Sequence, residues 1–213
     1  DRRWLEISEA SLALWKPRGG KRRGAGRTAR TARSNAPHDL REGLLREFPA
    51  HVTLRQQPGL PSLREQELFE VVLRVLTASA FGLFFRIVEF SVQKNHLHLL
   101  IEAADRLSLS TGMKSLVGRL SREINTHLGR SGRVLADRYH LHVIKSPREA
   151  RWALLYVLGN ALKHAREAGV RIPAGWIDPR SSGPWFRGWS DADESSLWPE
   201  KKPVADARTW LLH

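Results

Sequence analysis

Two histidines one residue apart are the first residues in this chain whose types and spacing suggest chemistry. They are His96 and His98, within the apolar run NHLHLLIE. Side chains alternate across a β-strand, so in a strand both imidazoles leave the same face a few ångströms apart. Neutral imidazoles in that arrangement can bind a metal ion. A single pair of this kind is more often a packing feature, so a third ligand and a reactive partner are needed.

A second pair, His140 and His142, repeats the pattern, and spacing alone does not choose between the two. A helix expected further on offers Tyr156 and Asn160, which are four residues apart and therefore share a face, with Lys163 one turn later. A phenol oxygen, an amide oxygen that can bind a hard cation and an ammonium suited to phosphate are then presented together. An ordinary amphipathic helix would show the same pattern.

Hydrophobic periodicity predicts the elements that must position these side chains. We expect a strand at 50–55, a helix at 63–80, a hairpin of strands at 84–92 and 96–102, a helix capped by Ser108 or Ser110 and ended by Gly129, a strand at 138–145, and a helix from Pro147, capped by Ser146, to about Arg166. This order predicts an α+β fold, an antiparallel sheet with helices packed on it, of ferredoxin-like type.

Composition limits the classes of protein. The 213 residues are 41% hydrophobic, enough for one core, and contain no cysteine, which excludes disulfides, thiolate ligands and a cysteine nucleophile. The sequence has no apolar run long enough for a membrane span and no apolar signal region, so we expect no membrane partner and a cytoplasmic, nucleoid-associated protein. The chain begins at Asp1 and its single methionine is Met113, from which we expect an incomplete or trimmed start.

The charge is strongly one-sided, with 35 Lys and Arg against 22 Asp and Glu, a net charge of +13. Such an excess favours a nucleic-acid partner. Residues 1–37 are rich in glycine and cations and are expected to form a disordered basic arm, which would lie on DNA or serve only as a solubilising tail. Two sets of basic residues are expected to contact DNA: Lys21, Arg22 and Arg23 in the arm, and Lys114, Arg119 and Arg122 on the outer face of the helix that ends at Gly129. For the second set, the alternative is an ordinary solvated helix surface.

From about His51 to Lys163 the sequence resembles the single-tyrosine HUH endonucleases, most closely the REP-associated tyrosine transposases of bacterial chromosomes. The segment HLH at 96–98 matches the His-bulky-His motif, HVTLR at 51–55 resembles the opening strand, and YVLGN at 156–160 resembles a segment that usually reads YIxxNPVK. Ala and Leu at 161 and 162 replace the usual Pro-Val, from which we expect a straighter helix without lost chemistry.

The resemblance implies an HUH endonuclease fold and a role for each motif residue. His96, His98 and Asn160 would bind Mg²⁺ or Mn²⁺, and Tyr156 would attack a DNA phosphate to form a 5′-phosphotyrosine. The bond energy is retained in that link, so rejoining needs no nucleotide cofactor, and the sequence has no GxxxxGK[ST] loop. His142 is expected near the DNA.

Two alternatives for these roles remain less favoured. His140 and His142 are not the expected metal pair, because in the resemblance the histidine motif matches 96–98. His142 lies on the strand leading into the helix of the tyrosine, and His140 has no assigned role. Tyr139 is the only other tyrosine and lacks an amide four residues later.

The resemblance divides the chain into the arm at 1–37, a single-tyrosine HUH transposase domain at 38–172 and a Trp-rich extension at 173–213, which would either stack on bases or cover the domain. The expected function is a transposase-like endonuclease and strand transferase that nicks and rejoins single-stranded hairpin or repeat DNA, as a monomer or homodimer. The alternatives are a catalytically silent domesticated DNA-binding protein and an RNA-binding α+β module.

Overall fold

The structure is a computed structural model that describes residues 46–136, 138–173, 175–189 and 201–212. The expected basic arm, with Lys21, Arg22 and Arg23, lies outside the described residues. The elements follow the order β1 (Ala50–Arg55), α2 (Gln66–Ser79), β2 (Phe85–Val92), β3 (His96–Ala103), α3 (Arg106–His127), β4 (His140–Val143), α4 (Pro147–Leu158) and α5 (Asn160–Glu167), with a short 3₁₀ turn at Gly183–Trp185.

The strands form one antiparallel sheet in the order β2-β3-β1-β4. Two β-α-β units are interleaved so that β1 and β3 occupy the centre, which is the ferredoxin-like arrangement. The predicted α+β class and the antiparallel sheet are therefore confirmed. β4 is shorter than the expected strand at 138–145, since it is an edge strand that pairs with β1 only from Ala50 to Thr53.

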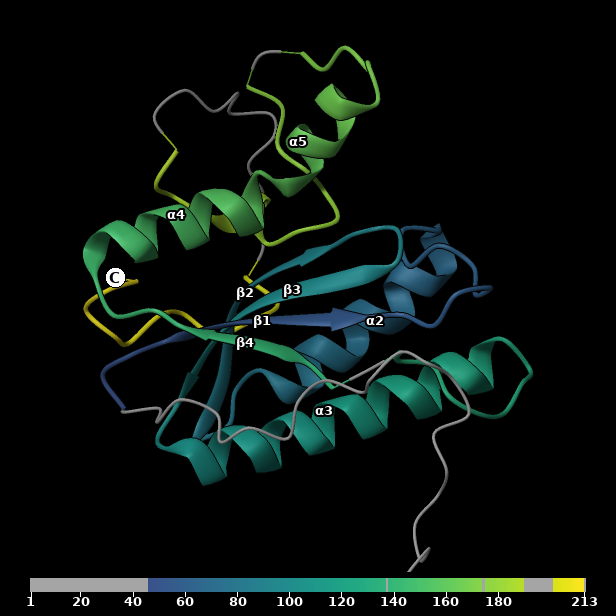
Figure 1. The fold of residues 1–213 in the computed structure, drawn as a ribbon, viewed down its shortest axis with the longest axis horizontal. Coiled ribbons are helices and arrows are strands. Elements are labelled where there is room, and N and C mark those ends of the chain that lie inside the picture. The colour runs from purple at the N-terminus through teal and green to yellow at the C-terminus, as the bar shows by residue number, and fades with distance from the viewer. Residues whose placement is uncertain (1–45, 137, 174, 190–200, 213) are drawn as a thin grey trace, which may run out of the picture. The chain divides into compact units, whose positions relative to one another are not determined.

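Alternation along the strands gives the sheet two different faces. On one face the buried residues of β1 and β3, such as Val52 and Leu99, join a large core with α2 and α3. On the other face Val88, Leu100 and Ile144 join a smaller core with α4. Figure 1 shows α3 and α4 on opposite sides of the sheet. A side chain on the face of Leu100 therefore points toward α4.

The helix α3 begins earlier than predicted and has a different cap. Asp105 is extended, with φ −162°, and its carboxylate accepts a hydrogen bond of 2.7 Å from the backbone N–H of Ser108. The expectation that Ser108 or Ser110 caps this helix is therefore wrong. A carboxylate preceding Arg106 can satisfy free N–H groups of the first turn, and the serines then lie inside the helix.

The expectation of one straight helix from Pro147 to about Arg166 is also wrong. α4 ends at Leu158, the cap residue Gly159 has φ −93° and ψ 2°, and α5 starts at Asn160. Glycine has a low helix propensity, and a Cβ at position 159 would lie 2.6 Å from the carbonyl oxygen of Leu155. The break precedes the replaced Pro-Val positions, so those residues do not decide it. Figure 1 shows α5 leaving the direction of α4.

The described parts of the C-terminal segment pack against the domain. Asp178 is buried and forms an ion pair of 2.8 Å with Arg64, and Ala205 donates a backbone hydrogen bond to Ile87. The carboxylate of Glu102 on β3 accepts hydrogen bonds from the backbone N–H groups of Arg208 and Thr209. These contacts favour a covering role for this segment. No helix in the described ranges has the length and apolar character that crossing a membrane requires.

Candidate active site

The central strands present polar side chains to the α4 side of the sheet. His96 and His98 alternate with Leu97 and Leu99, which belong to the large core, so both imidazoles emerge on the opposite face. Their ring centroids are 4.7 Å apart. The pairing of β1 with β3 places Thr53 opposite His98. The same-face geometry predicted from the spacing is thus present.

The two ring nitrogens of His98 have different surroundings. Nδ1 lies 3.1 Å from Nε2 of His51 and 3.2 Å from Oγ1 of Thr53, both on β1. Nε2 is buried and has no hydrogen-bond partner among the described residues. A ring that donates from Nδ1 keeps a lone pair at Nε2, which is the tautomer that a metal ligand needs.

His96 is arranged in the same way by a different neighbour. Its Nδ1 lies 2.8 Å from Oδ1 of Asn95, an oxygen that only accepts, so His96 donates from Nδ1 and has a lone pair at Nε2. Two imidazoles that can each offer an Nε2 lone pair on one sheet face form a potential ligand pair.

The electrostatics keep these rings neutral. Burial, together with the nearby rings of His51 and His96, lowers the pKa of His98 to about 3. Burial is also the main cause that lowers the pKa of His51 to about 4, helped by His142 and His140 on β4. The pKa of His96 is lowered, mainly by burial and then by His164 and Arg55. Neutral imidazoles have lone pairs available for a cation.

Tyr156 lies on α4 above this pair. Its ring centroid is 5.1 Å from that of His98 and 5.6 Å from that of His51. The side chain is 44% exposed, and the ammonium of Lys163 lies 5.8 Å from the centroid of the ring. The phenol is therefore close to the histidines and accessible to a large substrate.

Asn160 is the first residue of α5, directly after the break at Gly159. It is 2% exposed, and neither its amide oxygen nor its amide nitrogen has a hydrogen-bond partner among the described residues. Leaving a buried polar group unsatisfied costs about 1–3 kcal/mol, and a native structure usually retains such a group for a reason.

The unsatisfied atoms fit a hard divalent cation. The amide oxygen of Asn160, with positions left to water or phosphate oxygens, suits Mg²⁺ or Mn²⁺, whereas imidazole nitrogens are more typical ligands of later transition metals. Within the described ranges no group of three or more His, Asp or Glu side chains is placed to hold a metal ion.

The other predicted contacts lie elsewhere. His142 is on the exposed edge strand, 3.8 Å from a carboxylate oxygen of Glu149. Tyr139 packs against the large core, which lies on the sheet face opposite Tyr156. Lys114, Arg119 and Arg122 are exposed on α3, also on the side of the sheet opposite α4, so any contact of theirs with DNA would be separate from the tyrosine.

Two histidines near the site had no predicted role. One is His51. It alternates with Thr53 on the predicted strand at 50–55, and this spacing could have shown that both side chains share a face of the sheet. The other is His164, whose ring centroid lies 6.0 Å from that of His96, and which follows Asn160 by one helical turn. His96, His164 and Trp176 line a cavity of about 420 Å³ between β3 and α5.

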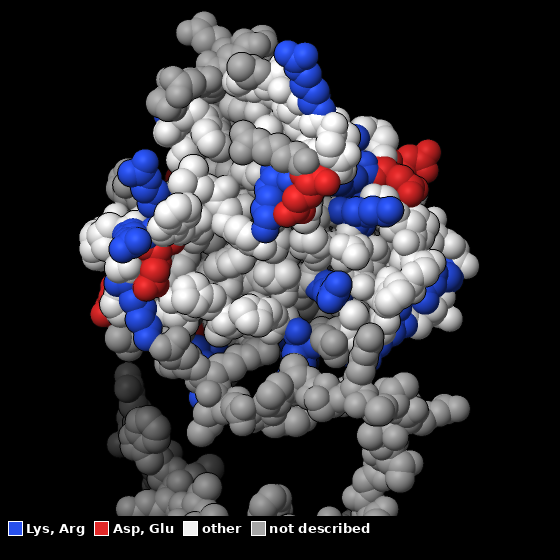
Figure 2. Space-filling view, turned by 45° about the horizontal axis from the view of Figure 1, so that its top comes forward, with Lys and Arg blue, Asp and Glu red and all other residues white. Residues whose placement is uncertain are grey.

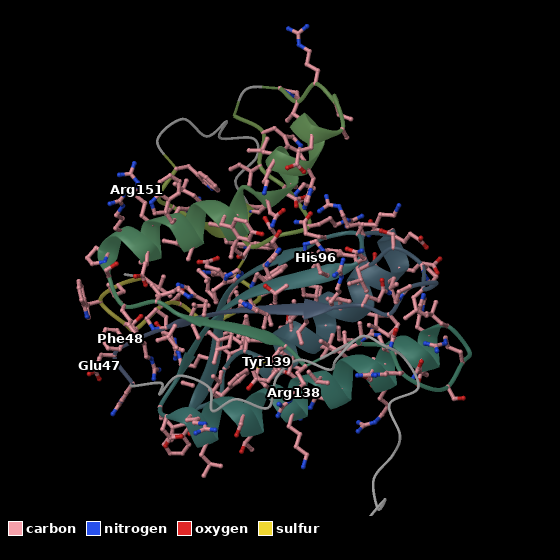
Figure 3. All side chains as sticks on the ribbon, viewed as in Figure 1. Glu47, Phe48, His96, Arg138, Tyr139 and Arg151 are labelled. Carbon is pink, nitrogen blue, oxygen red and sulfur yellow. The ribbon has the colours of Figure 1, made fainter. Side chains whose placement is uncertain are left out.

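On the side of the molecule that carries α4 and α5, the charged residues are more often basic than acidic. Figure 2 shows Lys and Arg side chains spread over it, with fewer acidic ones. In Figure 3, His96 lies at the start of the central strand β3, below α5. A basic surface around a neutral ligand pair and an accessible phenol is suited to a phosphodiester substrate.

Comparison with known proteins agrees with this geometry. Residues 62–150 match the model of a family described as "Transposase IS200 like", and this range includes the histidine pair and ends before Tyr156. The matched range spans less than half of the chain, and this similarity agrees with the resemblance to tyrosine transposases.

Two solved structures are similar to the chain at low identity. One is that of a REP-associated tyrosine transposase bound to a REP hairpin, with 14% identity over 60% of this chain and 74% of that chain and a TM-score of 0.46. The other is a protein of Deinococcus radiodurans R1 provisionally described as a transposase, with 14% identity over 65% of this chain and 100% of that chain and a TM-score of 0.37. No curated protein matches the sequence.

Proposed function

We propose that this chain is a metal-dependent DNA strand transferase that cleaves single-stranded DNA with Tyr156. The observation that carries the proposal is the position of the Tyr156 ring, 5.1 Å from the ring of His98, whose Nε2 is buried and without a partner. A nucleophile and a potential ligand pair are thereby held on facing elements.

The residues of the chain have distinct roles in this proposal. His96, His98 and Asn160 would hold Mg²⁺ or Mn²⁺, and the bound ion would polarise the phosphoryl oxygens and offset the charge of the transition state. The phenol oxygen of Tyr156 attacks the phosphorus, and the bond between phosphorus and the 3′ oxygen breaks. The products are a 5′-phosphotyrosine and a free 3′-hydroxyl, and the reverse attack rejoins a strand without ATP.

Activation of the phenol requires loss of its proton. A free tyrosine has a pKa near 10, so it is a poor nucleophile when protonated. The exposure of the side chain allows the proton to leave to water.

We further propose that the substrate is hairpin or repeat DNA with unpaired flanks, and that residues 38–172 form the catalytic unit. The test is incubation of the full chain with labelled single-stranded hairpin DNA and Mn²⁺, followed by denaturing electrophoresis. We expect an SDS-resistant adduct that Tyr156→Phe and chelation both abolish and that Tyr139→Phe retains. An adduct that survives Tyr156→Phe and disappears in Tyr139→Phe would overturn the assignment.

A catalytically silent DNA-binding protein is the second candidate, favoured by the excess positive charge. It predicts tight DNA binding without an adduct across varied hairpins. An RNA-binding module predicts instead that RNA of the same sequence binds more tightly than DNA.

A further inference from the structure

The helix α4 has one face that packs and one that does not. Ala150, Ala153, Val157 and Leu158 are buried in the smaller core, so they account for the attachment of the helix to the sheet. The indole of Trp152 is on the other face and is 62% exposed. This large aromatic side chain therefore contributes little to the packing of α4.

Trp152 is aligned with the proposed nucleophile. It precedes Tyr156 by four residues, so the two side chains share one stripe of the helix and are about 6 Å apart along its axis. Both rings are accessible from the same side. A DNA strand that reaches the phenol of Tyr156 must therefore either pass beside the indole of Trp152 or run from the phenol toward the opposite end of α4.

The charge around the indole is positive. The exposed residues of α4 include Arg148, one turn before Trp152, and Arg151 beside it. The single acidic residue of this helix, Glu149, lies 3.8 Å from His142 on β4. In Figure 3 the side chain of Arg151 extends from α4 away from the sheet. An exposed aromatic ring beside arginines is the combination by which proteins bind unpaired nucleotides, with stacking on the bases and cations on the phosphates.

We propose that Trp152 is a stacking platform for an unpaired base of the strand that Tyr156 attacks, and that Arg148 and Arg151 bind the adjoining phosphates. The proposal rests on the proposed function, because it assigns this face of α4 to the same DNA strand. It requires single-stranded DNA, since a base within a duplex has no free face to offer. It also adds a contact that none of the metal ligands provides.

Affinity measurements separate stacking from charge. Fluorescence anisotropy in a Tyr156→Phe background, with chelator, reports binding of the full chain without cleavage. We expect Trp152→Ala to weaken binding of single-stranded DNA about 5- to 150-fold, because stacking on one base is worth roughly 1–3 kcal/mol. Binding of a blunt duplex should change less than about twofold, and the salt dependence should not change, since no charge is removed.

The matched controls are on the same helix. Leu155 is also exposed and apolar but has no aromatic face, so Leu155→Ala should alter affinity less than about twofold. Trp152→Phe should recover part of the loss. Arg148→Ala and Arg151→Ala should each reduce the slope of log affinity against log salt by about 0.7, the value for one phosphate contact on a single strand.

An abasic scan identifies the base. Replacing each nucleotide in turn by an abasic site should weaken binding to the Trp152-containing protein at one position and have no further effect at that position in Trp152→Ala. The proposal would be overturned if Leu155→Ala lost as much affinity for single-stranded DNA as Trp152→Ala. It would also be overturned if Trp152→Ala weakened duplex binding equally, or did not change the affinity for single-stranded DNA. Tighter Trp152-dependent binding of RNA, or sedimentation showing that Trp152→Ala converts a dimer to a monomer, would overturn it as well.

Failure of this proposal is distinguishable from failure of the proposed function. At saturating DNA, a protein with Tyr156 intact and Trp152→Ala should still form the SDS-resistant adduct. If even the unaltered protein forms no adduct, the proposed function fails, while the anisotropy and abasic data still decide the role of Trp152.

Discussion

The ring nitrogen Nδ1 of His98 lies 3.1 Å from Nε2 of His51 on the neighbouring strand. This contact joins a buried potential metal ligand to a residue that has no ligand role, and it leaves the other nitrogen of His98 free. Partners of this kind fix the orientation and tautomer of a metal-binding imidazole.

Removing this partner should weaken metal binding. We expect His51→Ala to lower the affinity for Mn²⁺ about 10-fold, the lower end for loss of a ligand's supporting hydrogen bond, because Thr53 still contacts Nδ1 of His98. Calorimetric titration with Mn²⁺ measures the change. His51→Gln, whose amide oxygen can accept from Nδ1, should recover part of it. His140→Ala on the exposed edge strand is the control, and an equal loss there would exclude a specific role for His51.

The buried amide of Asn160 should lower the stability of the metal-free protein and raise the stability of the metal-bound protein. Asn160→Leu removes an unsatisfied buried amide, so the metal-free protein should be as stable as the parent, or more stable by about 1–3 kcal/mol. The rise in Tm on adding Mn²⁺ should shrink, since one ligand is lost. Thermal unfolding with chelator and with Mn²⁺ checks both effects. A variant that is strongly destabilised in chelator and keeps the full Mn²⁺ shift would show that Asn160 is structural.

Two glycines of α3 should respond oppositely to alanine. A Cβ at Gly112 would lie 2.2 Å from the ring of Phe85, so Gly112→Ala should destabilise the protein by about 1–3 kcal/mol through overpacking. Gly118 has nothing within 4 Å of an added Cβ, so Gly118→Ala should stabilise it by about 0.5–1 kcal/mol through helix propensity. Urea unfolding measures both. Similar effects at the two positions would contradict the close packing of α3 on Phe85.

The cap of α3 should make stability depend on pH. The backbone N–H of Ser108 hydrogen-bonds the carboxylate of Asp105 and lowers its pKa. Because the pKa is lower in the folded state, the stabilisation is complete above the ordinary range of an aspartate and is lost as the pH falls through the lowered value. The stability difference between the parent and Asp105→Ala should therefore narrow in acid.

The control for this effect is Asp105→Asn, whose side chain still caps the helix but does not titrate at this position. The difference in stability between Asp105→Asn and Asp105→Ala should stay constant over the same range of pH. Denaturant unfolding from neutral to acid pH measures all three proteins. If the difference between Asp105→Asn and Asp105→Ala changed with pH as much as the difference between the parent and Asp105→Ala, the pH dependence would belong to other groups.

Local patterns in the sequence were sufficient for most of the elements and for the residues proposed to do chemistry. Strict alternation around His96 and His98 predicts a strand with both imidazoles on one face, because the period of a strand depends only on its own backbone. The order of the elements predicts the ferredoxin-like sheet. The match of Tyr156 and Asn160 to the tyrosine transposases chose between the two histidine pairs, which spacing alone could not do.

Other features were decided by interactions between segments far apart in the chain. His51 comes next to His98 only through the register of β1 against β3, and Trp152 becomes an exposed neighbour of Tyr156 only once the rest of α4 is buried. The break at Gly159 was missed because a single glycine is tolerated within many helices. The sequence by itself therefore determined which side chains are present and the periodicity that groups them. Only the tertiary structure decided which groups meet and which atoms remain unpartnered, because strand register and burial depend on the packing of the whole domain.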